Sequence, residues 1–138
     1  MLLLDTNVVS ELRKVRAGKA NSKVAAWADS VDASELYLSV ITLMELELGI
    51  LRFERKDPEQ GALLRAWMKY HVLPEFAERT LPLDTAVALR CARLHVPDSG
   101  PDRDAYIAAT AIVHGMTVVT QNVADFERTG VPVLNPWS

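Results

Sequence analysis

The chain alternates between short apolar runs and longer stretches in which apolar residues recur at helical spacing. A continuous apolar run suits a strand that is buried on both faces of a parallel sheet. Strands are therefore predicted at residues 2–4, 36–39, 117–120 and 133–134, with a short proline-containing edge strand at 80–83.

The amphipathic stretches between these runs predict helices. After Thr42, one apolar stripe at helical spacing is formed by Leu43, Leu46, Ile50 and Leu51. Further helices are predicted over residues 8–12, 24–28, 57–72, 84–94 and 102–114.

Capping signals set the ends of several of these helices. Asp57 followed by proline opens one helix, and Pro74 is expected to end it. Asp84 is expected to cap the helix after the edge strand, and Gly115 to stop the last long helix. Parallel strands need crossover connections, so this alternation predicts an α/β fold with a mainly parallel sheet of four to five strands, in one domain spanning residues 1–138.

The composition is that of an ordinary globular domain, because 49% of the 138 residues are apolar and 24% are charged. The formal net charge of −3 argues against nucleic-acid binding through a broad cationic face. Any contact with nucleic acid must therefore be local. The acidic balance fits a cation-binding site or a basic protein partner better than free DNA binding.

The cellular compartment is constrained by two features. Cys91 is the single cysteine and cannot form an internal disulfide, and the residues after Met1 lack the pattern of a secretion signal. No apolar stretch reaches the roughly twenty residues that a membrane-spanning helix needs, since Asp5 and Glu45 interrupt the longest runs. We therefore expect a cytoplasmic protein with no membrane segment.

Four acidic residues are predicted to meet at one edge of the sheet. Asp5 ends the first strand, Glu45 lies about one turn after the second, and Asp125 follows the strand at 117–120. Asp104 opens the helix that leads back to that same strand. In a parallel sheet, ligands bind beyond the carboxyl ends of the strands, so these carboxylates are expected to share one site.

Such a cluster needs a compensating charge or a proton. Two like charges about 4 Å apart repel by roughly 4 kcal/mol at an effective dielectric near 20. Either some of the acids carry raised pKa values, or a divalent cation lies between them. An all-oxygen ligand set favours Mg²⁺ or Mn²⁺ over zinc, and the chemistry that it implies is phosphoryl transfer with water.

Each acid also has a purely local interpretation. Asp5 has the position of an N-cap for the following helix. Thr42 and Glu45 have the spacing of a capping box, in which the glutamate bonds back to the cap amide. Asp125 has the context of a turn residue.

The helix start near Asp104 contains two further charged residues of interest. Residues 99–102 form a capping pattern, which assigns Asp102 to the cap and leaves Asp104 free for metal. Arg103 is a candidate phosphate contact because it lies beside Asp104. The basic stretch at residues 13–23 is better interpreted as a solvated face.

Four segments, taken in order, resemble the motifs of PIN-domain nucleases. Asp5-Thr6-Asn7 is similar to the opening motif, and residues 42–46 (Thr-Leu-Met-Glu-Leu) to the second. Residues 104–111, an Asp that opens an Ile-Ala-Ala-rich helix, resemble the third motif, and residues 120–126 (Thr-Gln-Asn-Val-Ala-Asp-Phe) the fourth. The ordered set covers essentially the whole chain.

The length and the ending at residues 133–137 resemble the VapC and FitB-like toxins of bacterial toxin–antitoxin pairs. This resemblance implies a three-layer α/β/α sandwich, Mg²⁺-dependent (or Mn²⁺-dependent) cleavage of RNA and a homodimer. It also implies inhibition by an antitoxin that binds DNA through a ribbon-helix-helix or similar segment.

The resemblance also assigns roles to the acids. Asp5 and Asp104 would be the principal metal ligands, Glu45 would complete the site or orient water, and Asp125 would bind a second ion or act through water. Neighbouring polar side chains are expected to orient these ligands by hydrogen bonds: Thr6, Asn7, Thr120 and Asn122.

Two other functions are compatible with parts of the pattern. A haloacid-dehalogenase-like phosphatase also has an Asp at the end of its first strand, but it needs a second Asp where this chain has Asn7 and a late lysine, whereas the last lysine here is Lys69. A catalytically silent module that keeps the fold to bind a partner or repress its own operon is the third hypothesis. Cleavage assays on purified protein distinguish it from an enzyme.

Overall fold

Five strands form one parallel sheet in the computed structural model, which describes residues 1–138. The strand order is β3-β2-β1-β4-β5. The strands are β1 (Leu2–Leu4), β2 (Leu36–Ser39), β3 (Thr80–Leu81), β4 (Thr117–Val119) and β5 (Val133–Leu134). All five predicted strands are confirmed, and β3 lies at the edge as expected.

Helices connect successive strands, as parallel pairing requires. The longer ones are α1 (Thr6–Arg13), α2 (Ser22–Ser30), α3 (Val40–Lys56), α4 (Pro58–Trp67), α6 (Thr85–Leu94) and α7 (Asp102–His114). The short ones are α8 (Val123–Phe126) and the 3-10 turns η1 (Ala33–Glu35) and η3 (Glu127–Thr129). Asp84 caps α6 and Gly115 ends α7 in the left-handed conformation, both as predicted.

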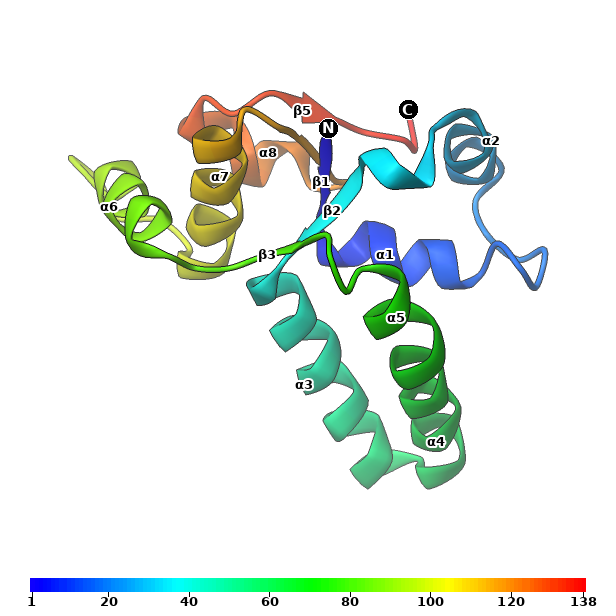
Figure 1. The fold of residues 1–138 in the computed structure, drawn as a ribbon. Helices are drawn as coiled ribbons and strands as arrows, with labels where there is room; N and C mark the ends of the chain where they lie inside the picture. The colour runs from blue at the N-terminus through cyan, green and yellow to red at the C-terminus, as the bar shows by residue number, and fades with distance from the viewer.

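Helices cover both faces of the sheet, because neighbouring residues of each strand point to opposite sides. In β1, Leu4 packs into a cluster with residues of α1, α3 and α4, including Ile50, whereas Leu3 packs with Ile107 of α7 and Phe126 of α8. Helix α6 lies outside α7 (Figure 1). The predicted three-layer α/β/α sandwich is confirmed.

Helices α3 and α4 form a hairpin that extends away from the sheet (Figure 1). The Arg65 guanidinium of α4 donates to Glu47 Oε1 over 2.6 Å and to Glu54 Oε1 over 3.0 Å, and both acceptors belong to α3. A Cβ on Gly61 would lie 2.6 Å from Glu54 Cα, so only glycine permits this close approach of the two helices. Close packing and ion pairs therefore both hold α3 and α4 together.

The helical path does not end at Pro74, contrary to the prediction. After α4 it widens into a π-helical turn, η2 (Met68–Val72), and continues as one further turn, α5 (Leu73–Glu75). The amide of Leu73 bonds to the carbonyl of Met68, five residues earlier. A widened turn of this kind accommodates a proline, which lacks the amide hydrogen that a regular helix would use.

Helix α3 begins at Val40, two residues before Thr42, so the capping-box interpretation of Thr42 and Glu45 is wrong. The N-cap is Ser39, whose hydroxyl accepts a hydrogen bond from the amide of Ile41 over 3.0 Å. Thr42 is fully buried inside the helix, and its hydroxyl donates to the carbonyl of Leu4 over 3.4 Å. This contact with β1 leaves Glu45 free for the sheet edge.

The prediction that Asp102 caps α7 is also wrong. The cap position is Pro101, which has no side-chain acceptor, and Asp102 is the first residue of the helix. A side chain one position inside the helix does not reach the amides that an N-cap side chain serves. The Asp102 side chain is 79% exposed, with Oδ1 3.7 Å from His95 Nε2.

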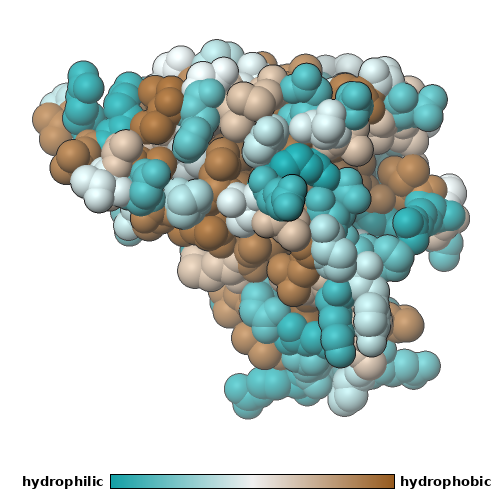
Figure 2. Space-filling model, in the orientation of Figure 1, coloured by the Kyte–Doolittle hydropathy of each residue, from teal (hydrophilic) through white to brown (hydrophobic).

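The surface carries apolar side chains on several helices. Met44 and Leu51 of α3 are about half-exposed, and Leu89 of α6 and Val96 beyond its end are more exposed. Figure 2 shows hydrophobic residues among polar ones where the α3–α4 hairpin joins the body. None of the helices has the length and apolar character needed to cross a membrane.

Candidate active site

Asp5 lies where β1 gives way to α1, at the carboxyl edge of the sheet. Its amide donates to the carbonyl of Val119 in the adjacent strand β4 over 2.9 Å, so the backbone of Asp5 is fixed by the sheet. Its side chain is 5% exposed and caps α1 by accepting from the amide of Thr6 over 2.9 Å. The capping and site interpretations of Asp5 are therefore compatible.

The Asp5 carboxylate is oriented by two further side chains. Its Oδ2 accepts from Thr120 Oγ1 over 2.8 Å and from Asn7 Nδ2 over 3.1 Å. Burial raises the pKa of Asp5 above its ordinary value, the hydrogen bonds from Thr120 and Thr6 oppose that rise, and the nearby charge of Glu45 adds to it. Asp5 is thus a fixed carboxylate in a low-dielectric setting.

The Thr120 hydroxyl links the loop after β4 to the start of α1. It donates to Asp5 and accepts from Asn7 Nδ2 over 3.2 Å and from the amide of Asn122 over 3.0 Å. Asn7 Oδ1 accepts from the amide of Gln121 over 3.0 Å. Asn122 therefore contributes through its backbone amide, whereas Asn7 and Thr120 contribute through their side chains.

Glu45 reaches the same edge from the second turn of α3. Its Oε1 accepts from Thr6 Oγ1 over 2.7 Å, and its Oε2 lies 3.6 Å from the Arg103 guanidinium of α7. Thr6 thus contacts both acids, Asp5 through its amide and Glu45 through its hydroxyl. This shared neighbour holds together carboxylates that are distant in sequence.

Asp104 is half-buried in the first turn of α7, facing the other acids. Burial, followed by the charges of Asp5, Asp125 and Glu45, raises the pKa of Asp104 to about 6. Asp125 is exposed on α8, and the two aspartates line one small cleft between the start of α7 and α8. All four predicted acids therefore face one region at the sheet edge.

The fit of a cation to this region can be judged from the donor chemistry. No three His, Cys, Asp or Glu side chains stand close enough together to hold an ion as the chain is folded. The carboxylates still act on one another, because the charges of Asp5, Asp125 and Glu45 add to burial in raising the pKa of Asp104. A set of oxygen donors under like-charge repulsion suits a hard divalent cation.

Sequence reasoning missed two residues that position this site. Thr42, assigned to a cap, instead holds the carbonyl that precedes Asp5. Arg128 lies three residues after Asp125 and donates to the carbonyls of Leu94, at the end of α6, and Asp98, in the loop before α7. Both roles depend on contacts remote in sequence, so no local pattern indicated them.

Comparison with known proteins places this arrangement in a family. The model of the PIN domain matches residues 2–132. The chain belongs to the PIN-domain family. Toxin FitB of Neisseria gonorrhoeae is 39% identical over 99% of both chains, and VapC ribonuclease Y4jK of Sinorhizobium fredii is 37% identical over 99% of this chain and 98% of its own. The structure of FitAB bound to the IR36 DNA fragment is 38% identical, with a TM-score of 0.88, and covers 100% of this chain and 96% of the solved one.

The PIN family removes the phosphatase alternative. That chemistry needs an acid where this chain has Asn7, and the Asn7 side chain is occupied in bonds to Asp5, Thr120 and the amide of Gln121. Asn7 is thus part of the framework that holds Asp5. The sheet edge is organised around one buried aspartate and three more exposed acids, as in the four ordered motifs.

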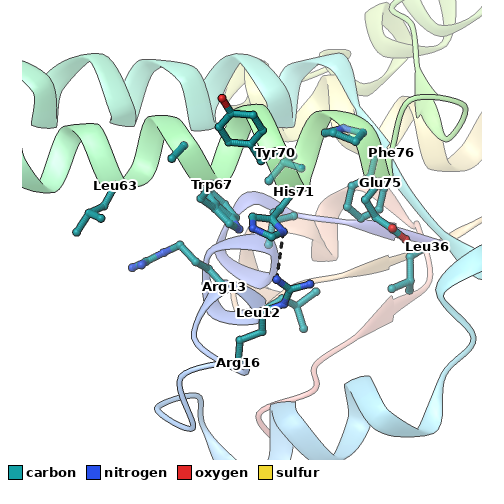
Figure 3. Close-up of a pocket in the computed structure, with 14 residues that line it drawn as sticks. Leu12, Arg13, Arg16, Leu36, Leu63, Trp67, Tyr70, His71, Glu75 and Phe76 are labelled. Carbon is teal, nitrogen blue, oxygen red and sulfur yellow. Dashed lines mark hydrogen bonds between the residues drawn. The ribbon is translucent and has the colours of Figure 1, made fainter.

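A separate groove of about 800 Å³ lies between α1 and the helical run from α4 to α5, which we call the α1–α4 groove. Figure 3 shows Trp67 and His71 facing Leu12 and Arg16 across it, with Arg16 hydrogen-bonded to His71 Nδ1 over 3.2 Å. Nine of its 14 lining residues are hydrophobic, and none of the four site acids lines it. The groove is therefore distinct from the acidic site.

Proposed function

We propose that this PIN-domain protein is a Mg²⁺-dependent or Mn²⁺-dependent endoribonuclease that acts as the toxin of a toxin–antitoxin pair. The observation that carries the proposal is the meeting of four acids from distant segments at one sheet edge, where Thr6 bonds both Asp5 and Glu45, and Asp104 and Asp125 line one cleft. The like charges of Asp5, Asp125 and Glu45 act on Asp104, so the cluster carries mutual repulsion. A cation relieves that repulsion and gives the cluster a function. The names of the relatives, toxin FitB and VapC ribonuclease, support the same assignment.

Asp5 and Asp104 would hold the cation, with Glu45 completing the site and Asp125 acting through water or a second ion. When bound, the cation supplies Lewis-acid chemistry by lowering the pKa of water and offsetting phosphate charge. Thr120 fixes the Asp5 carboxylate, and Thr6 fixes that of Glu45. Because a bound cation would activate water, no side chain is needed as a nucleophile.

The test compares wild type with Asp5→Asn and Asp104→Asn. Wild type should arrest growth when expressed and should cleave single-stranded RNA in Mg²⁺ or Mn²⁺ after purification. The two variants should do neither, while circular dichroism shows them folded. Asp102→Asn is the matched control, because it removes an exposed carboxylate from the same helical turn. Equal toxicity of all four proteins would refute the mechanism.

We further propose that a DNA-binding antitoxin, of ribbon-helix-helix or similar type, occupies the α1–α4 groove. Its walls are mainly apolar, and Leu63 and Tyr70 on its rim are 64% and 65% exposed. Arg13 and Arg16 line it with one acid, Glu75, so an acidic amphipathic segment complements its charge. A DNA-bound assembly, FitAB, is among the similar solved structures.

The groove assignment predicts that antitoxin binding and catalysis can be separated. Leu63→Glu should leave RNA cleavage unchanged, because Leu63 lies outside the acidic site. Coexpression of the antitoxin, sought as the product of the adjacent reading frame, should then neutralise wild type but not the variant. Neutralisation of both proteins to the same extent would reject the groove as the docking site.

We also propose a homodimer. Exposed apolar side chains on α3 and α6, among them Leu51 and Leu89, support a self-association surface away from the α1–α4 groove. Light scattering during gel filtration should give twice the chain mass of 15.3 kDa, and Leu89→Lys should lower it. A monomeric wild type at micromolar concentration would contradict this part of the proposal.

A further inference from the structure

Arg103 is the one cation that forms an ion pair with the site carboxylates. It lies in the first turn of α7, next to Asp104 in sequence, and its guanidinium approaches Glu45 Oε2 of α3 to 3.6 Å. The Arg103 side chain is 50% exposed, and that of Glu45 is 24% exposed. Arg103 therefore spans the solvent-facing side of the acidic site, between α3 and α7.

The hydrogen-bonding capacity of Arg103 is not used by the protein. A guanidinium has five N–H donors, and a separation of 3.6 Å is longer than a hydrogen bond. Arg65 and Arg79 differ, because each donates several hydrogen bonds to acceptors on other elements. Those two arginines are part of the folded framework, whereas Arg103 keeps its donors available.

An RNA strand that enters an acidic site is repelled by the carboxylates, and a bound cation offsets only part of that repulsion. A cation would offset charge at the phosphate to be cleaved, but the flanking phosphates would still be repelled by carboxylates such as Glu45 and Asp125. A planar guanidinium matches phosphate oxygens with paired donors. Arg103 has the charge, the free donors and the position to hold one of these flanking phosphates.

We propose that Arg103 binds the RNA substrate. Its guanidinium gives up the weak pairing with Glu45 and instead holds a phosphate next to the cleaved bond. This inference rests on the proposed ribonuclease function and adds a positioning role outside the acid set. Its contact with Glu45 is exposed and long, so exchange to a phosphate is readily reversible. RNA binding and metal binding are then carried by different side chains.

The binding test uses an Asp104→Asn background to stop cleavage and a fluorescently labelled single-stranded RNA in Mg²⁺. Arg103→Gln should raise the Kd by about tenfold, the effect of losing a charged hydrogen-bonded contact. The slope of log Kd against log salt should fall by about 0.7, as for one phosphate contact. Arg103→Lys should give an intermediate Kd. Arg52→Gln, an exposed arginine of α3, controls for net charge and should leave Kd unchanged.

The kinetic and metal tests separate substrate binding from a merely structural or counter-charge role. In otherwise wild-type protein, Arg103→Gln should raise KM by about tenfold and leave kcat within about twofold. The Mn²⁺ concentration at half-maximal thermal stabilisation, measured without RNA, should be unchanged. A shifted Mn²⁺ midpoint with unaltered RNA Kd and KM would assign Arg103 to Glu45 alone and overturn the inference.

The outcomes also distinguish this inference from the function on which it rests. A wild-type protein that cleaves RNA, with Arg103→Gln identical to Arg52→Gln, would overturn only the role of Arg103. A wild-type protein that neither binds nor cleaves RNA would overturn both.

Discussion

Removing the Asp104 charge should make the metal-free protein more stable while abolishing its activity. The ionised carboxylate of Asp104 is disfavoured by burial and by repulsion from three other acids, which raise its pKa from 3.8 to about 6. A carboxamide of the same shape has no charge to repel. Asp104→Asn therefore relieves a strain that the fold carries for the benefit of the site.

The magnitude follows from that pKa. A rise from 3.8 to about 6 corresponds to at most about 3 kcal/mol, and partial exposure of Asp104 reduces this to about 1–2 kcal/mol. Loss of a carboxylate at a helix N-terminus opposes it by about 0.3–1 kcal/mol. The net gain of roughly 1 kcal/mol should raise Tm by about 3–4 °C in a chain of this size.

The pH dependence has a definite sign. Because the folded-state pKa of Asp104 is raised, the folded protein binds more protons than the unfolded chain between about pH 4 and pH 6. The stability of wild type therefore falls as pH rises through that window. The stabilisation by Asp104→Asn should be full above about pH 6 and vanish near pH 4.

The assay is thermal unfolding in EDTA from pH 4 to 8, with Asp102→Asn as the matched control. Asp102 occupies the same helical turn but is exposed, so its loss removes only favourable interactions and should leave Tm equal or lower. Mg²⁺ should raise the Tm of wild type and leave that of Asp104→Asn unchanged. A lower Tm for Asp104→Asn at pH 8 in EDTA would refute the reasoning.

Three further predictions concern the framework of the site. Thr120→Val should lower the free energy of unfolding in urea by about 1–3 kcal/mol and reduce cleavage, because Asp5 and two other partners lose their hydrogen bond to the hydroxyl. Thr120→Ser should restore both stability and cleavage. An equal loss in the Ser and Val variants would contradict this. Ser39→Ala should lower the free energy of unfolding by about 1 kcal/mol, because α3 loses its N-cap, whereas Glu45→Gln should not reduce stability. A loss of stability in Glu45→Gln would support the capping role of Glu45 instead. Cys91 is 3% exposed and burial raises the pKa of its thiol, so a thiol reagent should modify native protein far more slowly than protein in urea. Equal rates would show that the packing of α6 against α7 does not cover it.

The strands were predictable because they depend on local pattern, and the edge at which the acids meet follows from the strands. Short apolar runs marked every strand, and parallel topology then brought Asp5, Glu45 and Asp104 to one edge. The predictions held because the hydrophobic period is a property of each segment by itself.

The wrong predictions concern local signals that the folded chain overrides. Both Ser39 and Thr42 are good N-cap residues, and only the carbonyl of Leu4 explains why Thr42 is inside the helix. Pro74 is a reliable stop in an isolated helix, but a widened turn before it lets the helix continue. The separation of the carboxylates was equally inaccessible, because it depends on side-chain positions that only the folded chain sets.

The central claim is that the four acids share a hard divalent cation, and Mn²⁺ binding measured by electron paramagnetic resonance tests it most directly. Wild type and Asp102→Asn should bind Mn²⁺ with the same affinity. Asp5→Asn and Asp104→Asn should each weaken binding by at least about tenfold, and Mg²⁺ should displace the ion from wild type. Equal Mn²⁺ binding by all four proteins, or no binding by wild type, would contradict the account.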